Sequence, residues 1–248
     1  MITPSPHKQE NSPVFAGEFL FLWTPIVHES NIKEEIQLKD IMSISKLLRE
    51  SSKPQHQEAE NSTFIVELMK GQLNVDAYKK YLVNLAWLYL ALEEKIQEGE
   101  PAPSTEMLWD ARLNRLNAIS EDLAQLGIEN WQETTEPSMA MKSYIDHIKS
   151  LNGKSDHKLI AHHYTRYLGD LSGGQAIAAL VARHYGISRE QLNFYSFTEI
   201  EDLVRYKEHY REVLDSLQFS EKQINELVEE VQLAFSFNQK VFEDLDRK

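Results

Sequence analysis

The stretch YKKYLVNLAWLYLAL, residues 78–92, predicts a long buried α-helix. Its apolar side chains recur at steps of three and four residues, so they fall on one face of a helix. The same period returns along the rest of the chain, whereas the strict alternation of a β-strand is not sustained anywhere. The helical segments expected from this pattern are residues 65–69, 78–92, 108–126, 139–151, 157–185, 199–217 and 221–245. We therefore expect an all-α, single-domain, multi-helix bundle over residues 42–248.

Composition excludes several classes of protein. The chain holds 9 glycines and 8 prolines in 248 residues, below the usual usage of about 7% and 5%, which excludes a collagen-like or loop-rich chain. No apolar run approaches the roughly 18 residues of a membrane span, so no membrane span is predicted. The absence of cysteine fits a reducing compartment, and a cytoplasmic location is expected.

The net charge and the absence of cysteine exclude or disfavour several kinds of function. With 39 acidic and 26 basic side chains, the net charge is −13, which repels the phosphate backbone and argues against nucleic acid as a partner. Without cysteine, thiolate nucleophiles, disulfides and Cys-ligated clusters are excluded together. Any haem or metal ion must therefore be bound through His, Asp, Glu, Tyr or Met.

Residues 1–41 differ from the rest of the chain. Four of the eight prolines fall within the first 25 positions, and the only apolar burst, residues 19–23, is too short for a signal peptide. We expect an N-terminal extension that is poorly ordered or loosely docked. The alternative that translation starts at Met42 stays open.

Glycine, scarce elsewhere, is concentrated in the stretch YTRYLGDLSGGQ, residues 164–175. Each glycine inside a helix costs about 0.5–1 kcal/mol relative to alanine, so the cluster is expected to serve packing or a ligand. A tight helix crossing and close approach of the backbone to a flat ligand are both compatible with it. Asp170 within the stretch either organises water near that ligand, pairs with Arg166, or is simply exposed.

A histidine on another predicted helix is a candidate iron ligand. His56 has Glu60 one turn later, and an imidazole that binds iron through one nitrogen commonly donates its other N–H to an acid. The same spacing is also that of an ordinary surface pair. His162 and His163 point about 100° apart on a helix, so they are interpreted as structural.

Basic residues gather at two places, although the chain is acidic. Arg49 and Lys53 precede His56, and Lys207 and Arg211 stand four residues apart on a late helix. Each pair alone is most simply explained as part of a solvent-exposed helix face. Together, the two pairs could hold two carboxylates of a ligand. Pro54 removes a backbone donor and is expected to kink the helix or restart it nearby.

Three motifs resemble the biliverdin-producing, bacterial-type haem oxygenase family. The stretch 164–175 resembles its distal-helix signature, HQEAE at residues 56–60 its proximal-helix motif, and AFSFNQKVFEDL at residues 234–245 its final helix. The resemblance covers residues 43–246. It implies an enzyme that cleaves protohaem with O₂ and reducing equivalents to biliverdin, carbon monoxide and ferrous iron. Haem b would be both cofactor and substrate, and a ferredoxin or a flavoprotein reductase would supply electrons.

The resemblance also implies roles for individual residues. His56 would ligate the iron and Glu60 would be its hydrogen-bond partner. Gly169 and Gly173 would press the backbone against the haem, with Ser172 and Gly174 supporting a bend. The remaining expected residues are Asp170, Arg166 and Tyr89 in a distal water network, Arg49, Lys53, Lys207 and Arg211 at the propionates, and Tyr164, Phe235, Asn238 and Phe242 along the pocket.

Two other functions remain compatible with these residues. A haem carrier or sensor would keep the fold without turnover, although carriage needs neither Asp170 nor three clustered glycines. A helical interaction protein would bind no cofactor at all. Addition of hemin, followed by a reductant in air, distinguishes the three.

Overall fold

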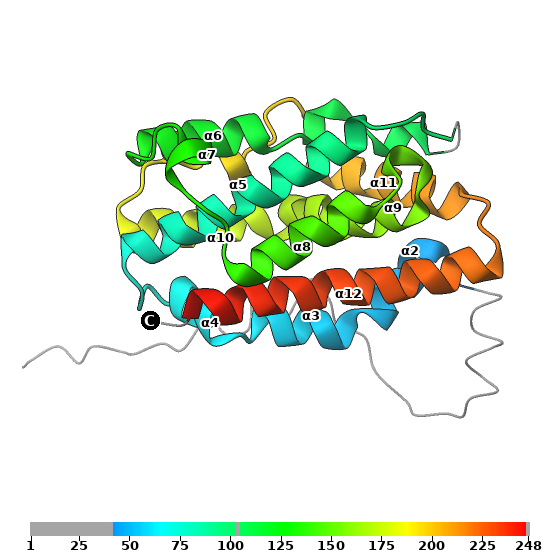
Figure 1. Cartoon of the computed structure of the whole chain (residues 1–248), viewed down its shortest axis with the longest axis horizontal. Coiled ribbons are helices and arrows are strands. Elements are labelled where there is room, and N and C mark those ends of the chain that lie inside the picture. The colour runs from blue at the N-terminus through cyan, green and yellow to red at the C-terminus, as the bar shows by residue number, and fades with distance from the viewer. Residues whose placement is uncertain (1–41, 103–104, 247–248) are drawn as a thin grey trace, which may run out of the picture. The chain divides into compact units, whose positions relative to one another are not determined.

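The computed structural model describes residues 42–102 and 105–246 (Figure 1). Every regular element in these residues is helical, which confirms the all-α prediction. The expectation for residues 1–41 lies outside the described residues. The α-helices are α2 (Ile44–Ser51), α3 (Lys53–Glu60), α4 (Thr63–Met69), α5 (Val75–Gln97), α6 (Leu116–Gln125), α7 (Trp131–Thr134), α8 (Met139–Ser150), α9 (His157–His163), α10 (Gly169–Tyr185), α11 (Leu203–Ser216) and α12 (Glu221–Asp246). Short 3₁₀ turns lie at Glu106–Leu108, Ala111–Leu113, Gly153–Ser155, Arg189–Gln191 and Asn193–Tyr195.

Helix α5 is the buried centre of the predicted pattern. Tyr78, Leu82, Leu88 and Leu92 are all fully buried, as one face of a 3.6-residue period requires. Asn74 caps the helix, because its side chain accepts a hydrogen bond from the amide of Ala77. Helices α6 and α8 pack against α5 (Figure 1).

Helix α12 connects most of the other elements. It packs against α3 and α4 as well as against α8 and α9 (Figure 1). Ser220 caps its start, since the Ser220 hydroxyl accepts a hydrogen bond from the amide of Gln223 at 3.3 Å. Because α12 contacts helices from the beginning and from the middle of the described chain, its side chains lie beside residues far from it in the sequence.

Pro54 restarts the helix, as expected. Helix α2 ends at Ser51, and α3 begins at Lys53 with the proline in its first turn, where the missing amide hydrogen is not needed. The buried Ser52 between them donates its hydroxyl to the carbonyl of Leu48 at 2.7 Å. The direction of α3, and with it His56, is therefore set by this break.

Helix α11 begins at Leu203, four residues later than the predicted start at residue 199. The carboxylate of Asp202 accepts hydrogen bonds from the amides of Val204 and Arg205. Such a cap favours the helix start at this position.

The glycine cluster does not lie inside an uninterrupted α-helix. Tyr164–Leu168 form a π-helical turn between α9 and α10, so that Gly169 is the first residue of α10. A π turn inserts one extra residue into the helical ladder and commonly occurs at functional sites. The departure from α-geometry thus lies before the glycines rather than at Ser172 and Gly174.

Among residues 42–102 and 105–246, no helix is both long enough and apolar enough to cross a membrane.

Candidate functional site

The three clustered glycines have two different environments. A Cβ atom built on Gly169 or on Gly173 would meet no neighbouring atom within 4 Å, whereas one on Gly174 would lie 3.3 Å from Cδ1 of Tyr195. Gly169 and Gly173 are one turn apart and so share a face of α10. Gly174 therefore packs against Tyr195, whereas Gly169 and Gly173 leave a bare stripe of backbone beside open space.

Asp170 lies next to this stripe and is held by two other side chains. The hydroxyl of Tyr89 donates a short hydrogen bond to Oδ2 of Asp170, and Nη2 of Arg166 donates to Oδ1 at 3.3 Å. The predicted pairing of Asp170 with Arg166 is therefore present, together with Tyr89. The side chains of Arg166 and Asp170 are only 11% and 12% exposed, so this group is largely removed from water.

Arg166 extends the network to the last helix. Its Nη1 donates to Oδ1 of Asn238 at 3.0 Å, and Nδ2 of Asn238 donates to the carbonyl of Ala234 at 2.7 Å. The guanidinium also lies over the ring of Tyr89, 5.5 Å from its centroid. Tyr89, Arg166, Asp170 and Asn238 thus form one hydrogen-bonded unit drawn from α5, the π turn, α10 and α12.

Burial sets the direction of the pKa shifts of Asp170 and Tyr89. It raises the pKa of Asp170, although Arg166, the Tyr89 hydroxyl and Arg115 act to lower it. Burial also raises the pKa of Tyr89 well above its ordinary value, which keeps the phenol protonated as a donor. Asp170 can therefore hold a proton at a higher pH than an exposed aspartate.

His56 on α3 contacts its predicted partner Glu60 and one of the predicted pocket residues, Phe235. Its Nδ1 lies 3.4 Å from Oε2 of Glu60, and its ring meets that of Phe235 edge to face at 5.3 Å. The side chain of His56 is 31% exposed. The imidazole is therefore oriented by an acid and an aromatic ring while part of it stays accessible.

One face of α12 carries three of the predicted pocket residues. Phe235, Asn238 and Phe242 follow at steps of three and four residues, which places them on the same side of the helix. Phe242 packs against Phe64 at 6.3 Å and Tyr81 at 6.0 Å between ring centroids. This face therefore joins the surroundings of His56, through Phe235, to the network of Arg166.

The predicted basic residues come from three helices. Ser45 on α2 donates its hydroxyl to Asp215 on α11 at 2.9 Å, so these two helices lie side by side. The positive charges of Arg211 and Arg49 both act on the buried hydroxyl of Tyr164, whose pKa is raised to about 12 chiefly by burial. Arg49 and Arg211 are therefore near enough to Tyr164 for their charges to act on its hydroxyl.

The other two predicted basic residues, Lys53 and Lys207, and also Ser172 lie in half-buried positions. Nη1 of Arg211 donates to the carbonyl of Lys207 at 3.3 Å, and burial, followed by Arg211, lowers the pKa of Lys207. Lys53 is half-buried at the start of α3, and Ser172 is half-buried in the first turn of α10. Arg49 is paired with the neighbouring Glu50 at 2.8 Å.

Sequence reasoning missed two buried charged residues, Arg115 and Glu93, near the network. Arg115 is buried, lies over the ring of Phe197 at 4.0 Å and donates to the carbonyl of Ser196 at 2.8 Å. The carboxylate of Glu93 accepts hydrogen bonds from the backbone amides of Arg115 and Leu116. The available signal was an acid, Glu93, directly after the apolar residues 78–92, because an acid on a buried face requires partners.

Solved structures of similar chains place this protein in the haem oxygenase-like class of helical folds. The crystal structure of heme oxygenase-1 from Synechocystis sp. PCC6803 in complex with heme is 31% identical, with a TM-score of 0.78, and covers 83% of this chain and 93% of that one. Heme oxygenase from Leptospira interrogans is 32% identical, with a TM-score of 0.76, over 81% and 98% of the two chains. A TenA homologue from P. horikoshii shares the fold alone, at 17% identity and a TM-score of 0.62.

The sequence matches identify the family. The heme oxygenase family model matches residues 42–244. The heme oxygenase of Porphyra purpurea is 35% identical over 83% of this chain and 88% of the relative, and heme oxygenase 1 of Nostoc sp. is 33% identical over 82% and 86%. The chain belongs to the heme oxygenase family, which confirms the resemblance drawn from its three motifs.

Proposed function

We propose that this protein is a haem oxygenase that cleaves protohaem with O₂ and reducing equivalents to biliverdin, carbon monoxide and ferrous iron. The observation that carries the proposal is the bare backbone at Gly169 and Gly173 beside the buried carboxyl of Asp170. A flat macrocycle can come into close contact with the backbone of a helix only where side chains are missing. Haem would be both cofactor and substrate, and its iron would supply the oxygen chemistry.

His56 would hold the iron of the haem through a ring nitrogen. The carboxylate of Glu60, at 3.4 Å from Nδ1, would accept the other ring proton and set the tautomer. The edge-to-face contact with Phe235 supports this role, because it restricts rotation of the imidazole. These two neighbours leave the histidine preorganised before the ligand arrives.

Asp170 would organise water and move a proton on the opposite side of the ligand. Its raised pKa lets the carboxyl hold a proton that a solvent-exposed aspartate would release. Tyr89 and Arg166 fix its two oxygens and so determine where that proton is presented. The absence of Cβ atoms at Gly169 and Gly173 would leave space for the haem and O₂ against the backbone, with Ser172 and Gly174 supporting that wall.

Four basic residues would bind the propionates. Arg49 and Arg211 lie near the buried Tyr164 hydroxyl, and Lys207 is partly desolvated beside Arg211. A positive group that has lost water gains more from a bound carboxylate than an exposed one does. With Lys53, these residues would set the orientation of the haem, while Phe235, Asn238 and Phe242 would line the pocket.

The remaining features of the proposal concern partners and organisation. Residues 42–248 would be the haem oxygenase domain, and residues 1–41 an N-terminal extension. The electron donor would be a ferredoxin or a flavoprotein reductase, and the net charge of −13 disfavours nucleic acid. A cytoplasmic location is supported by the cysteine-free composition.

The test adds hemin to the purified protein and follows the Soret band. A band that saturates at one haem per chain, then gives way to biliverdin absorbance when a reductant is added in air, supports the proposal. A Soret band that persists under these conditions would indicate a carrier instead. No Soret band at all would exclude both functions.

A further inference from the structure

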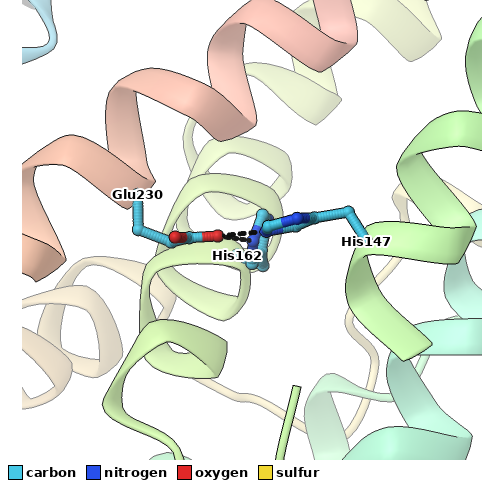
Figure 2. A group of neighbouring side chains, drawn as sticks. All are labelled: His147, His162 and Glu230. Carbon is cyan, nitrogen blue, oxygen red and sulfur yellow. Dashed lines mark hydrogen bonds and ion pairs between the residues drawn. The ribbon is translucent and has the colours of Figure 1, made fainter. Parts of the chain in front are cut away.

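Two histidines and a glutamate from three helices converge away from the residues discussed above. His147 is on α8, His162 on α9 and Glu230 on α12. Figure 2 shows both imidazole rings directed at the same carboxylate. Nε2 of His162 lies 2.8 Å from Oε1 of Glu230, and Nε2 of His147 makes a short contact with the same oxygen.

We propose that His147, His162 and Glu230 form a binding site for a divalent first-row transition-metal ion. The three ligand atoms all lie within 4.8 Å of one another. Two imidazole nitrogens and one carboxylate oxygen are the donor set of many zinc sites and of non-haem ferrous sites. Three protein ligands leave the remaining coordination positions to water.

Only a small rearrangement separates the present geometry from a coordinated one. Metal–ligand bonds of about 2.0–2.2 Å place neighbouring ligand atoms roughly 3.4 Å apart around a tetrahedral ion. The distance from each Nε2 atom to Oε1 of Glu230 must therefore increase by less than the length of a metal–ligand bond. His147, with a side chain 25% exposed, has room for the larger share of this movement, whereas the buried pair of His162 and Glu230, now 2.8 Å apart, needs to separate by only about 0.6 Å.

The hydrogen bonds around His162 suit a metal ligand. Its Nδ1 lies 3.1 Å from the hydroxyl of Tyr144, and a hydroxyl can either donate or accept. When Nε2 gives its lone pair to an ion, the ring proton moves to Nδ1 and is donated to Tyr144. Nδ1 of His162 keeps its hydrogen-bond partner through this change of tautomer, and Tyr144 then orients the ligand.

The cluster also has a route to solvent. His147 borders a surface hollow that is lined as well by Asp156, His157 and Lys158. Nε2 of His157 is 2.9 Å from Oε2 of Glu226, one turn before Glu230 on α12. Acidic and imidazole groups therefore line the approach to the proposed ion.

The ion of greatest interest is ferrous iron, and this part rests on the proposed function. Haem cleavage releases one ferrous ion per turnover. His162 precedes Arg166 by one turn of the same helical run, and Glu230 precedes Asn238 by two turns of α12. The cluster is thus connected by two helices to the Arg166–Asn238 contact and could receive the iron that the reaction liberates.

The decisive experiment titrates haem-free protein with Fe²⁺ under anaerobic conditions, and in a second arm with Co²⁺, by calorimetry. We expect one ion per chain, and affinity at least tenfold weaker in Glu230→Gln and in His147→Ala. The amide in the first variant preserves size, and the second removes a half-exposed ring, so both are expected to fold, as circular dichroism would check. His209→Ala, an exposed histidine paired with Glu212, is the matched control and should bind as the wild type does.

Equal affinity in the wild type and both cluster variants, or no ion bound by the wild type, would overturn the site. Binding of Co²⁺ but not Fe²⁺ would overturn the assignment to product iron. A further readout is capture of released iron by a ferrous chelator during turnover, which should be faster in Glu230→Gln at unchanged biliverdin yield. Because ion binding is measured without haem, failure of the proposed function would leave this test intact.

Discussion

Arg166 and Asn238 lie 72 residues apart in the sequence, yet Nη1 of the arginine donates to Oδ1 of the asparagine at 3.0 Å. The contact joins the π turn to α12, the helix that also carries Phe235 against the ring of His56. The two sides of the proposed haem site are therefore linked through a single helix. A substitution on either side of the site is therefore expected to affect the other side.

Replacement of Asn238 by leucine removes the acceptor of a largely buried guanidinium. A buried charged donor without a partner costs about 1–3 kcal/mol, so we expect the free energy of unfolding to fall by about that amount. Urea unfolding of the haem-free protein measures it. Ser236→Ala, on the same helix, removes only the hydrogen bond from the Ser236 hydroxyl to the carbonyl of Gln232 and should lose less, and an equal loss in the two variants would contradict the argument.

His56→Ala should abolish the spectrum of imidazole-ligated haem. Loss of the axial nitrogen leaves the iron without its protein ligand, so affinity for haem should drop by at least about tenfold. Absorption spectroscopy during hemin titration measures both effects, and His209→Ala is a suitable exposed control. An unchanged spectrum would exclude His56 as the ligand.

Asp170→Asn should still bind haem but yield little biliverdin. The amide keeps the size of the side chain and loses the ability to hold and release a proton, a contribution of about 100-fold or more in rate. Chromatography of the products per haem consumed is the measurement. A normal biliverdin yield would remove Asp170 from the mechanism.

The glycines give a matched pair of substitutions. Gly173→Ala adds a methyl group in open space and should stabilise the haem-free protein by about 0.5–1 kcal/mol, because alanine favours the helix. It should also weaken turnover of haem. Gly174→Ala places Cβ 3.3 Å from Tyr195 and should stabilise less, or destabilise. Thermal unfolding compares the two, and an identical gain would contradict the two environments.

The raised pKa of Tyr164 predicts that the free energy of unfolding depends on pH. Its pKa is raised from 10.0 to about 12 by burial, so its contribution to stability is fully present below pH 10 and is lost as the pH rises toward 12. Between pH 9 and pH 11 the wild type should lose about 1 kcal/mol more than Tyr164→Phe. Urea unfolding at the two pH values tests the difference, and parallel losses would refute it.

Much of the fold could be predicted from local pattern. The 3.6-residue period of residues 78–92, the break at Pro54 and the caps at Asn74 and Ser220 are all properties of neighbours in the sequence. The motif at residues 56–60 and the glycine stretch likewise identified the candidate site. The start of α11 was misplaced because the cap at Asp202 was not recognised.

The sequence alone determined which residues form helices and which residue types are available for chemistry, since helical periodicity, capping and composition are local. Only the tertiary structure decided that Gly174 packs on Tyr195 while Gly169 and Gly173 do not. It alone brought His162 to Glu230 and Arg166 to Asn238. Such pairings depend on how helices cross, and the crossing follows from burial of whole faces rather than from any short stretch of sequence.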